Sequence, residues 1–254
     1  MEELCSLLFE LSSEDRLKIL HELKKNPMKL SRVSEKFDFT VPETARNISR
    51  LSQANLVSKD TDGCFHLTPF GEQALRFLPG FEFLSKHKKY FKTHTLSTLR
   101  PRDQANIGVL ANSEFVNELT ETLFNVENMI RDAEEFVWAI MDQIFAGVIP
   151  LVIDGFKRGV ECRKILPRNA IIPQAIFKMA NDPAFTRAAR AHLMESRYLD
   201  RVDIVFSLSE KEVTAIVFPD LEGKFDYSSF RSKDQEALDW AKSMFLYYWD
   251  KAKR

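Results

Sequence analysis

Glycine is scarce in this chain, and the marks of several common protein classes are missing. Only 8 of the 254 residues are glycine, and no glycine-rich phosphate-binding loop can be found. The three cysteines, Cys5, Cys64 and Cys162, lie far apart and form no Cys-x-x-Cys pair. Such spacing is typical of reduced thiols in a cytoplasm and argues against disulfides, a zinc knuckle or a thiolate metal sensor. We therefore expect no bound metal and no cofactor.

Long hydrophobic runs are missing too. No segment approaches the ~20 apolar residues that a membrane helix needs, and the first residues lack the basic start of a secretory signal. The formal net charge of −1 argues against general adhesion to nucleic acid. We expect a cytoplasmic protein that makes no contact with a membrane.

Residues 12–67, in contrast, carry a dense set of local signals. The pattern predicts three helices, with residues 40–51 as the third. Thr40 suits the N-cap of that helix, Pro42 suits its first turn, and Glu43 completes a capping box. Helical spacing turns Thr44, Ile48 and Leu51 inward, which predicts that Glu43, Arg46, Asn47 and Arg50 face outward.

Two short strands are predicted directly after these helices. Residues 56–67 alternate around Asp62-Gly63, and Asp-Gly is a strong hairpin signal. A helix-turn-helix followed by a small hairpin is a winged helix, whose third helix fits the DNA major groove. The residues expected to bind DNA are Thr40, Glu43, Arg46, Asn47 and Arg50, with Lys59 in the wing.

The charge balance favours DNA binding only locally. Residues 1–80 hold 11 basic and 12 acidic residues, but residues 16–59 hold 10 basic and 4 acidic ones. Phosphate contacts need cations on one face only. The alternative is a small helical interaction domain with a solvated, charged face.

We place the first domain at residues 1–80 and a basic linker helix at 81–102. Thr68 is expected to cap a helix that runs through Leu78 and stops at Pro79-Gly80. The linker helix combines aromatic residues with six cations and no acid after residue 85. It either touches flanking phosphates or a second copy of the chain, or it is a connector whose apolar stripe docks on a neighbouring domain.

Residues 103–254 contain 19 basic and 24 acidic residues and are expected to form an α/β domain. Strands are predicted at 135–141 and 160–166 with a helix at 144–157 between them, which implies a parallel crossover. Residues 202–208 and 213–218 form a predicted hairpin, and further helices are predicted at 106–125, 173–180, 183–196 and 232–253.

Several segments resemble a known family. They are residues 90–96 (YFKTHTL), 157–167 (KRGVECRKILP) and 217–227 (VFPDLEGKFDY), followed by Trp240, Tyr248 and Trp249. Nearly the whole chain resembles archaeal transcriptional regulators that carry the methanogenesis-regulatory-protein middle domain. The resemblance implies an arsenic-repressor-like helix-turn-helix and a C-terminal effector domain with a phospholipase-D-like α/β fold. It also implies regulation of genes of methanogenic and related archaeal metabolism.

We expect no enzymatic activity and no catalytic residues. Phospholipase D chemistry needs His-x-Lys-x4-Asp, and the only His-x-Lys, His87 to Lys89, has His94 where the aspartate would stand. The other histidines have no nucleophile or carboxylate at a telling spacing.

An effector is expected at the carboxyl ends of the two parallel strands, where open parallel sheets bind ligands. Asp142, Gln143, Arg163 and Arg168 lie at or near those ends and could orient a small polar or anionic ligand. The alternative is that Asp142 caps the next helix and that the arginines pair with acids of the domain. The three tryptophans are expected in the core.

We thus expect a sequence-specific, homodimeric transcriptional regulator that binds double-stranded DNA and an unknown small-molecule effector. Dimer contacts are expected from the linker helix around Phe81, Leu84 and Phe91, or from the first helix through Leu4, Leu7, Leu8 and Leu11. The alternative is a winged-helix module that contacts proteins and does not bind specific DNA. The sequence leaves open the operator, the sign of regulation and the effector.

Overall fold

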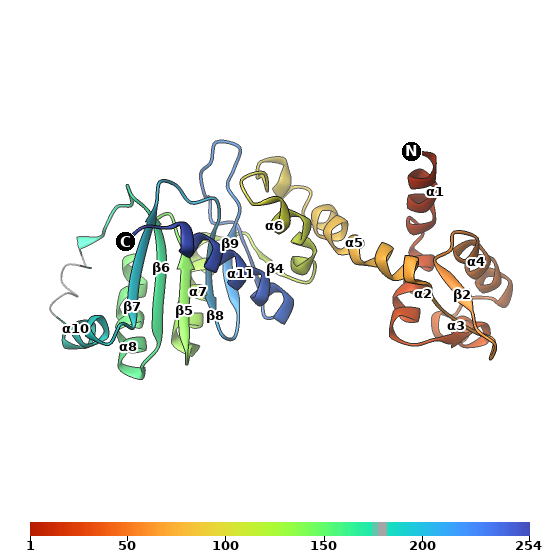
Figure 1. The fold of residues 1–254 in the computed structure, drawn as a ribbon, viewed down its shortest axis with the longest axis horizontal. Helices are drawn as coiled ribbons and strands as arrows, with labels where there is room; N and C mark the ends of the chain where they lie inside the picture. The colour runs from red at the N-terminus through yellow and green to blue at the C-terminus, as the bar shows by residue number, and fades with distance from the viewer. Residues whose placement is uncertain (175, 177–181) are drawn as a thin grey trace. The chain divides into compact units, whose positions relative to one another are not determined.

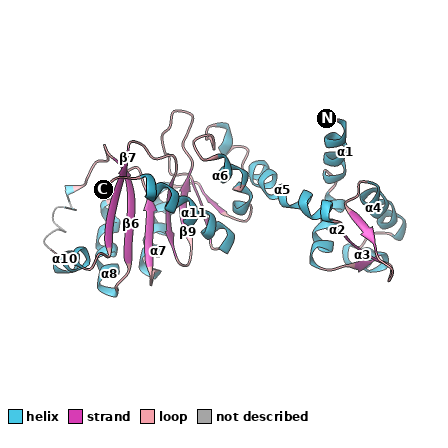
Figure 2. Ribbon diagram, viewed as in Figure 1, coloured by secondary structure: helices cyan, strands magenta, loops and turns pink. Residues whose placement is uncertain are grey.

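The structure, a computed structural model, describes residues 1–174, 176 and 182–254. The chain divides into two compact units, residues 1–79 and 80–254 (Figures 1 and 2). Each unit has its own hydrophobic core.

Unit 1 contains helices and a small antiparallel sheet. Its first four helices are α1 (Glu2–Leu11), α2 (Glu14–Lys25), α3 (Leu30–Phe37) and α4 (Val41–Gln53). The sheet has the order β1-β3-β2, formed by β1 (Met28–Lys29), β2 (Val57–Lys59) and β3 (Cys64–Leu67). The three helices and the hairpin predicted for residues 12–67 are confirmed. Strand β1 was not predicted, because two residues are too few to show a pattern and only pairing with β3 makes them a strand.

Helix α5 (Pro69–Lys86) begins where the sequence indicates but ends later. The Thr68 hydroxyl accepts the Gly71 backbone N–H at 2.9 Å, so Thr68 caps the helix. The predicted stop at Pro79-Gly80 is wrong, since α5 continues through the proline. An internal proline costs about 3 kcal/mol. Burial of Phe83 on the next turn, in the core of unit 2, offsets this by roughly 1.5–3 kcal/mol.

The predicted linker helix is also wrong beyond Lys86. A 3-10 turn, η1 (Tyr90–Lys92), follows instead. Phe83, Tyr90 and Leu99 are all buried in the core of unit 2, so this segment is part of that unit. The docked-connector alternative therefore describes residues 83–99 better than a free linker.

Unit 2 is built on a seven-stranded mixed sheet. The strand order is β4 (Glu114–Val116), β10 (Ser229–Ser232), β9 (Val213–Val217), β8 (Val205–Ser209), β5 (Phe136–Ile140), β6 (Glu161–Pro167), β7 (Met194–Leu199). Strands β5, β6 and β7 are parallel, and the other neighbours are antiparallel. The predicted β5–β6 parallel crossover and the β8–β9 hairpin are confirmed. Unit 2 is therefore a mixed α/β fold.

Helices cover both faces of this sheet. Figure 1 shows α11 (Gln235–Lys251) across one face, with α7 (Leu119–Asp132) and α8 (Ile149–Arg158) against the other. Helix α10 (Pro183–Arg190) packs beside α8. The α11 face forms the larger core, where Trp138, Trp240 and Trp249 are buried as predicted.

Other predicted elements of unit 2 are corrected by the structure. The helix predicted at 106–125 is replaced by η2 (Ile107–Leu110), β4 and the start of α7, and the short helix α6 (Pro101–Ala105) precedes them. Helix α8 starts at Ile149, after η3 (Ala146–Val148), and α10 ends before β7, which was predicted as helix. Strands β4, β7 and β10 depend on pairing with strands distant in sequence, so their local patterns did not predict them. The helix predicted at 173–180 falls mainly on 175 and 177–181, outside the described residues.

Candidate DNA-binding face and C-terminal cavity

Thr40 and Glu43 form the start of α4. The Thr40 hydroxyl accepts the Glu43 backbone N–H at 3.4 Å, and the Glu43 carboxylate accepts the Thr40 backbone N–H at 3.0 Å. The same carboxylate accepts the Thr40 hydroxyl at 2.8 Å, and these bonds hold the pKa of Glu43 below its ordinary value. Both side chains are therefore committed to the predicted capping box.

Arg46 projects from α4 as predicted. It is exposed, and no ion pair of its side chain is found in the described part of the chain. Pro42, Ser49 and Gln53 are exposed at the i−4, i+3 and i+7 positions relative to Arg46, so they share its face. Sequence analysis missed Ser49 and Gln53, although helical spacing from Arg46 was a signal that could have found them.

Asn47 does not face outward, which corrects the prediction. Asn47 is 8% exposed and is buried together with Thr44, Ile48 and Leu51. The positions i, i+3, i+4 and i+7 form one stripe of a helix, so the buried face of α4 is wider than the three residues used to define it.

Arg50 is held by α1 instead of facing freely outward. Its guanidinium donates to the Glu10 carboxylate at 3.0 and 2.6 Å and lies 5.0 Å from the ring centre of Phe9. The Glu10 carboxylate also pairs with Arg16 at 3.2 Å. The hydrogen bonds from Arg50 hold the pKa of Glu10 below its ordinary value. Arg50 must leave Glu10 before it can contact another anion.

Lys59 lies at the end of β2, beside the hairpin turn. It is exposed, and its ammonium is 5.6 Å from the ring centre of Phe65, its partner residue on β3. The Asp60 carboxylate accepts the backbone N–H groups of Asp62 and Cys64 at 3.0 and 2.7 Å. Gly63 has φ of 82°, which a glycine adopts at no steric cost. The turn thus presents Lys59 on an ordered hairpin.

Unit 2 contains a cavity of about 350 Å³ between its sheet and the helices α7 and α8. Small side chains from five neighbouring strands form its floor: Ala139, Cys162, Ser196, Ser207 and Ala215. Strand residues alternate between faces, and the opposite face of the same strands carries large side chains that pack against α11. These small side chains leave part of the space below the helices unfilled, although larger side chains such as Met141, Leu166 and Tyr198 also line it.

One row of paired residues crosses the cavity floor. Ala139 is the register partner of Lys164 on β6 and of Ser207 on β8, and Lys164 is the partner of Ser196 on β7. All four line the cavity. Lys164 is the only charged residue among the described lining residues, and no ion pair or side-chain hydrogen bond of Lys164 is found in the described structure.

The backbone of the cavity wall is strained in two places. Ala215 and Tyr227 both line the cavity, with φ of 51° and 65°. Such left-handed conformations cost about 1–2 kcal/mol for residues with a side chain, and they gather at ligand sites. The Tyr227 hydroxyl donates to the Asp142 carboxylate and accepts from the Gln143 amide at 3.3 Å. Burial, reinforced by Asp142, raises the pKa of Tyr227.

The four predicted effector residues are not brought together. Gln143 lines the cavity, and Asp142 reaches its edge through Tyr227. Arg163 lies on the α11 face, where it pairs with Glu161 at 3.0 Å and stacks over Trp138 and Trp249. Strand alternation explains this, since Cys162 and Lys164 face the cavity and Arg163 between them cannot.

Arg168 is exposed and pairs with Asp200 at 3.1 Å, away from the cavity lining. The predicted alternative, in which the arginines pair with acids of the domain, describes both arginines. Sequence analysis missed Lys164. Lys164 lies two residues from Cys162 and two residues from Leu166 on β6. This spacing places Lys164 on the same strand face as both of them and was the available signal.

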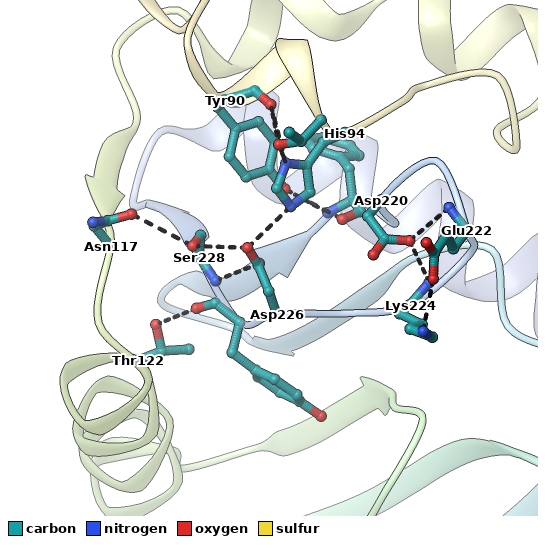
Figure 3. A network of polar contacts seen from close by, with 12 residues as sticks. Tyr90, His94, Asn117, Thr122, Asp220, Glu222, Lys224, Asp226 and Ser228 are labelled. Carbon is teal, nitrogen blue, oxygen red and sulfur yellow. Dashed lines mark hydrogen bonds and ion pairs between the residues drawn. The ribbon is translucent and has the colours of Figure 1, made fainter.

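A polar network joins the segment after α5 to the loop that carries Tyr227 (Figure 3). The ring of His94 stacks on Tyr90 with centres 3.8 Å apart, and its Nε2 lies 3.3 Å from the Asp226 carboxylate. The Tyr90 hydroxyl accepts the Phe218 backbone N–H at 3.1 Å. The Thr122 hydroxyl of α7 donates to the Tyr227 carbonyl at 3.0 Å. Asp226 is thus the immediate neighbour of a cavity residue and a partner of His94.

The described residues hold no group of three or more His, Cys, Asp or Glu side chains arranged to bind a metal ion. None of the helices in the described ranges combines the length and hydropathy needed to cross a bilayer.

Comparison with known proteins gives distant likenesses only. No model of a protein family matches the chain, and no curated protein matches it. Among solved structures, the archaeal chromatin protein TrmBL2, reported with a novel mode of DNA binding, is 14% identical. The likeness has a TM-score of 0.44 and covers 95% of this chain and 94% of TrmBL2.

Two further matches among solved structures cover about half of the chain. Nuc from Salmonella typhimurium, a phospholipase D family member, is 11% identical with a TM-score of 0.38, covering 52% of this chain and 88% of Nuc. NucT from Helicobacter pylori is 13% identical with a TM-score of 0.40, covering 55% of this chain and 99% of NucT. At these TM-scores the likenesses carry no argument about function.

Proposed function

We propose that this protein is a homodimeric, sequence-specific DNA-binding transcriptional regulator. In this proposal a small molecule bound in the cavity of unit 2 changes its affinity for DNA. Unit 1 acts as a winged helix, with α4 in the major groove and the β2–β3 hairpin as the wing. The resemblance to archaeal regulators is consistent with this role.

The observation that carries DNA binding is the exposed face of α4. Arg46 is exposed there with no partner in the described structure, and Ser49 and Gln53 extend the same face with hydrogen-bonding groups. Lys59 offers a second exposed cation on the hairpin. An arginine that is free of ion pairs can bind a guanine edge with two hydrogen bonds without first losing a protein contact. Arg50 lacks this freedom, so we assign the base contact to Arg46.

Selection of bound DNA from a random pool, at a stated salt concentration, tests this proposal. On the selected site Arg46→Ala is expected to lose about 1–3 kcal/mol of binding free energy, which is a roughly 5- to 150-fold loss of affinity. It should also relax the base preference at one position of the site. Lys59→Ala should lower the affinity for all DNA sequences alike and make that affinity less dependent on salt. Arg131→Ala, an exposed arginine of α7, is the control and should bind as wild type.

The alternative function is a winged-helix module that contacts proteins. The pairing of Arg50 with Glu10 favours it, because one of the expected DNA contacts is already occupied. The same selection separates the two functions. Failure to enrich any sequence would leave the protein-binding module, whereas wild-type affinity and preference in Arg46→Ala would refute Arg46 as the base contact.

We propose that α5 contributes the dimer contact. Phe70, Phe77, Phe81 and Leu84 follow one another at spacings of seven, four and three residues, as in a coiled-coil seam. Phe77 and Phe81 are 72% and 64% exposed. Large apolar side chains aligned on one helix indicate a contact with another chain.

The expected dimer contacts are revised accordingly. Phe91 packs against the core of unit 2, and Leu11 is buried in unit 1, so neither is available. Leu4 and Leu8 of α1 remain exposed and offer a second contact, whereas Leu7 packs partly against the core of unit 1.

The network in Figure 3 supports a route by which the cavity acts on the rest of the chain. A ligand that displaces Tyr227 also displaces Asp226, the partner of His94, and His94 lies eight residues after the end of α5. A ligand shifts DNA affinity only by binding the competent and incompetent arrangements differently. A ten-fold shift needs about 1.4 kcal/mol of differential binding.

We further propose that unit 2 binds its ligand without turning it over. His87, the histidine of the partial His-x-Lys pattern, is buried among Phe83, Phe115 and Phe230, and that burial lowers its pKa. A nucleophile needs access to substrate, which this position lacks. Hydrolysis of a phosphodiester by the purified protein would overturn this proposal.

A further inference from the structure

The cavity of unit 2 combines an apolar volume with a single cation. Its helical wall is aliphatic and aromatic, formed by Leu123 and Val126 of α7 and by Val152 and Phe156 of α8. Its floor carries Lys164, and no Asp or Glu is among the described lining residues. A volume of about 350 Å³ lies within the range of small-molecule sites.

Lys164 has no structural partner to account for its place on the sheet. Lys164 is half-buried, and a lysine that loses hydration in apolar surroundings is seldom found without a paired charge. At this position the helices cover the sheet face, and the neighbours within the same row are two hydroxyls, Ser196 and Ser207, and one methyl group, Ala139. A ligand that carries one negative charge supplies the missing partner.

The row also sets the geometry of recognition. Neighbouring strands lie about 4.8 Å apart, so Ser196 lies directly beside Lys164 on the floor and Ser207 lies two strands away. A carboxylate accepts several hydrogen bonds, and it can receive the ammonium and a hydroxyl together. The remainder of the ligand then meets mostly apolar side chains of α7 and α8, with Thr122 of α7 and Gln143 as polar exceptions.

We propose that the cavity binds an amphipathic monocarboxylate, an apolar chain with one carboxylate head, and that Lys164 holds the head with Ser196. This inference rests on the proposed effector role of the same cavity. The apolar chain of the ligand lies against the aliphatic wall, so its burial removes apolar surface from water. The head neutralises Lys164.

Isothermal titration of the full chain with decanoate, decanol and decylamine tests the inference, since the three share one apolar chain. Decanoate should bind at least ten-fold more tightly than decanol, and decylamine should bind more weakly than both. Lys164→Met should remove the preference for decanoate while decanol still binds, and Lys164→Arg should retain the preference. Lys157→Met is the control, since Lys157 is exposed on α8 and lies outside the cavity lining.

Equal affinity of decanoate and decanol for the wild type would overturn the inference, as would unchanged decanoate binding in Lys164→Met or no binding of any probe. Fluorescence anisotropy of the selected DNA with and without decanoate is measured separately. Lys164-dependent decanoate binding that leaves DNA affinity unchanged would refute the effector role and keep the site. If decanol changes DNA affinity as much as decanoate does, the effector role stands but recognition of the carboxylate head is refuted.

Discussion

Filling the cavity from its floor should stabilise unit 2. Ala139, the fourth of the five residues of β5, is 4% exposed and lines the cavity between Lys164 and Ser207. Ala139→Leu adds three carbons, which contribute about 2.4 kcal/mol at roughly 0.8 kcal/mol each. Restricting the new side chain costs about 0.5–1 kcal/mol. The expected net gain is therefore about 1.5 kcal/mol.

Thermal unfolding followed by tryptophan fluorescence measures this gain. All three tryptophans lie in unit 2, so the signal reports that unit. For a protein of this size about 1.5 kcal/mol raises Tm by roughly 3–6 °C. The same variant should lose decanoate binding, because the leucine occupies the ligand volume next to Lys164.

The matched control is Ala241→Leu, the same change on the opposite face of the sheet. Ala241 is fully buried on α11 in the larger core, outside the cavity lining. Overpacking a filled core costs about 1–3 kcal/mol, so this variant should unfold at a lower temperature. If Ala139→Leu destabilises the protein as much as Ala241→Leu, the reasoning from an open cavity is refuted.

Three further outcomes are expected. In light scattering, Phe77→Glu should convert a dimer of about twice 29.4 kDa into a monomer. Arg76→Glu is the control, because Arg76 is exposed on another side of α5, and it should stay dimeric. A monomeric wild type would contradict the dimer. His87→Phe should stabilise the protein by about 1–3 kcal/mol, since it removes a buried Nε2 that has no hydrogen-bond partner among the described residues. Because burial lowers the pKa of His87 from 6.5, the unfolded chain binds the proton first. Wild-type stability should thus fall below pH 6.5, more steeply than in His87→Phe, and equal slopes would contradict this. Gly71→Ala should destabilise unit 1 in urea by about 1–3 kcal/mol or more, because the added Cβ would lie 2.1 Å from the Leu56 carbonyl oxygen. Wild-type stability of this variant would show that Gly71 and the Leu56 carbonyl are not in tight contact.

Local signals in the sequence determined much of the secondary structure. The capping box of Thr40 and Glu43 and the Asp62-Gly63 turn each act within a few residues, and both lie where they were predicted. The apolar strands β5 and β6 and the wide apolar stripe of α11 are long enough to show their periods. These elements required no knowledge of which segments pack together.

Tertiary structure decided the site chemistry. Arg50 and Glu10 are 40 residues apart, so no pattern in α4 indicates that its second arginine is already paired. The cavity depends on small residues of five strands aligning in register, and two of its pairings join distant segments. Periodicity tells which face of a strand a residue occupies but not which strand lies beside it. For that reason the row that places Ser196 beside Lys164, and Ser207 two strands away, emerges only from the assembled sheet.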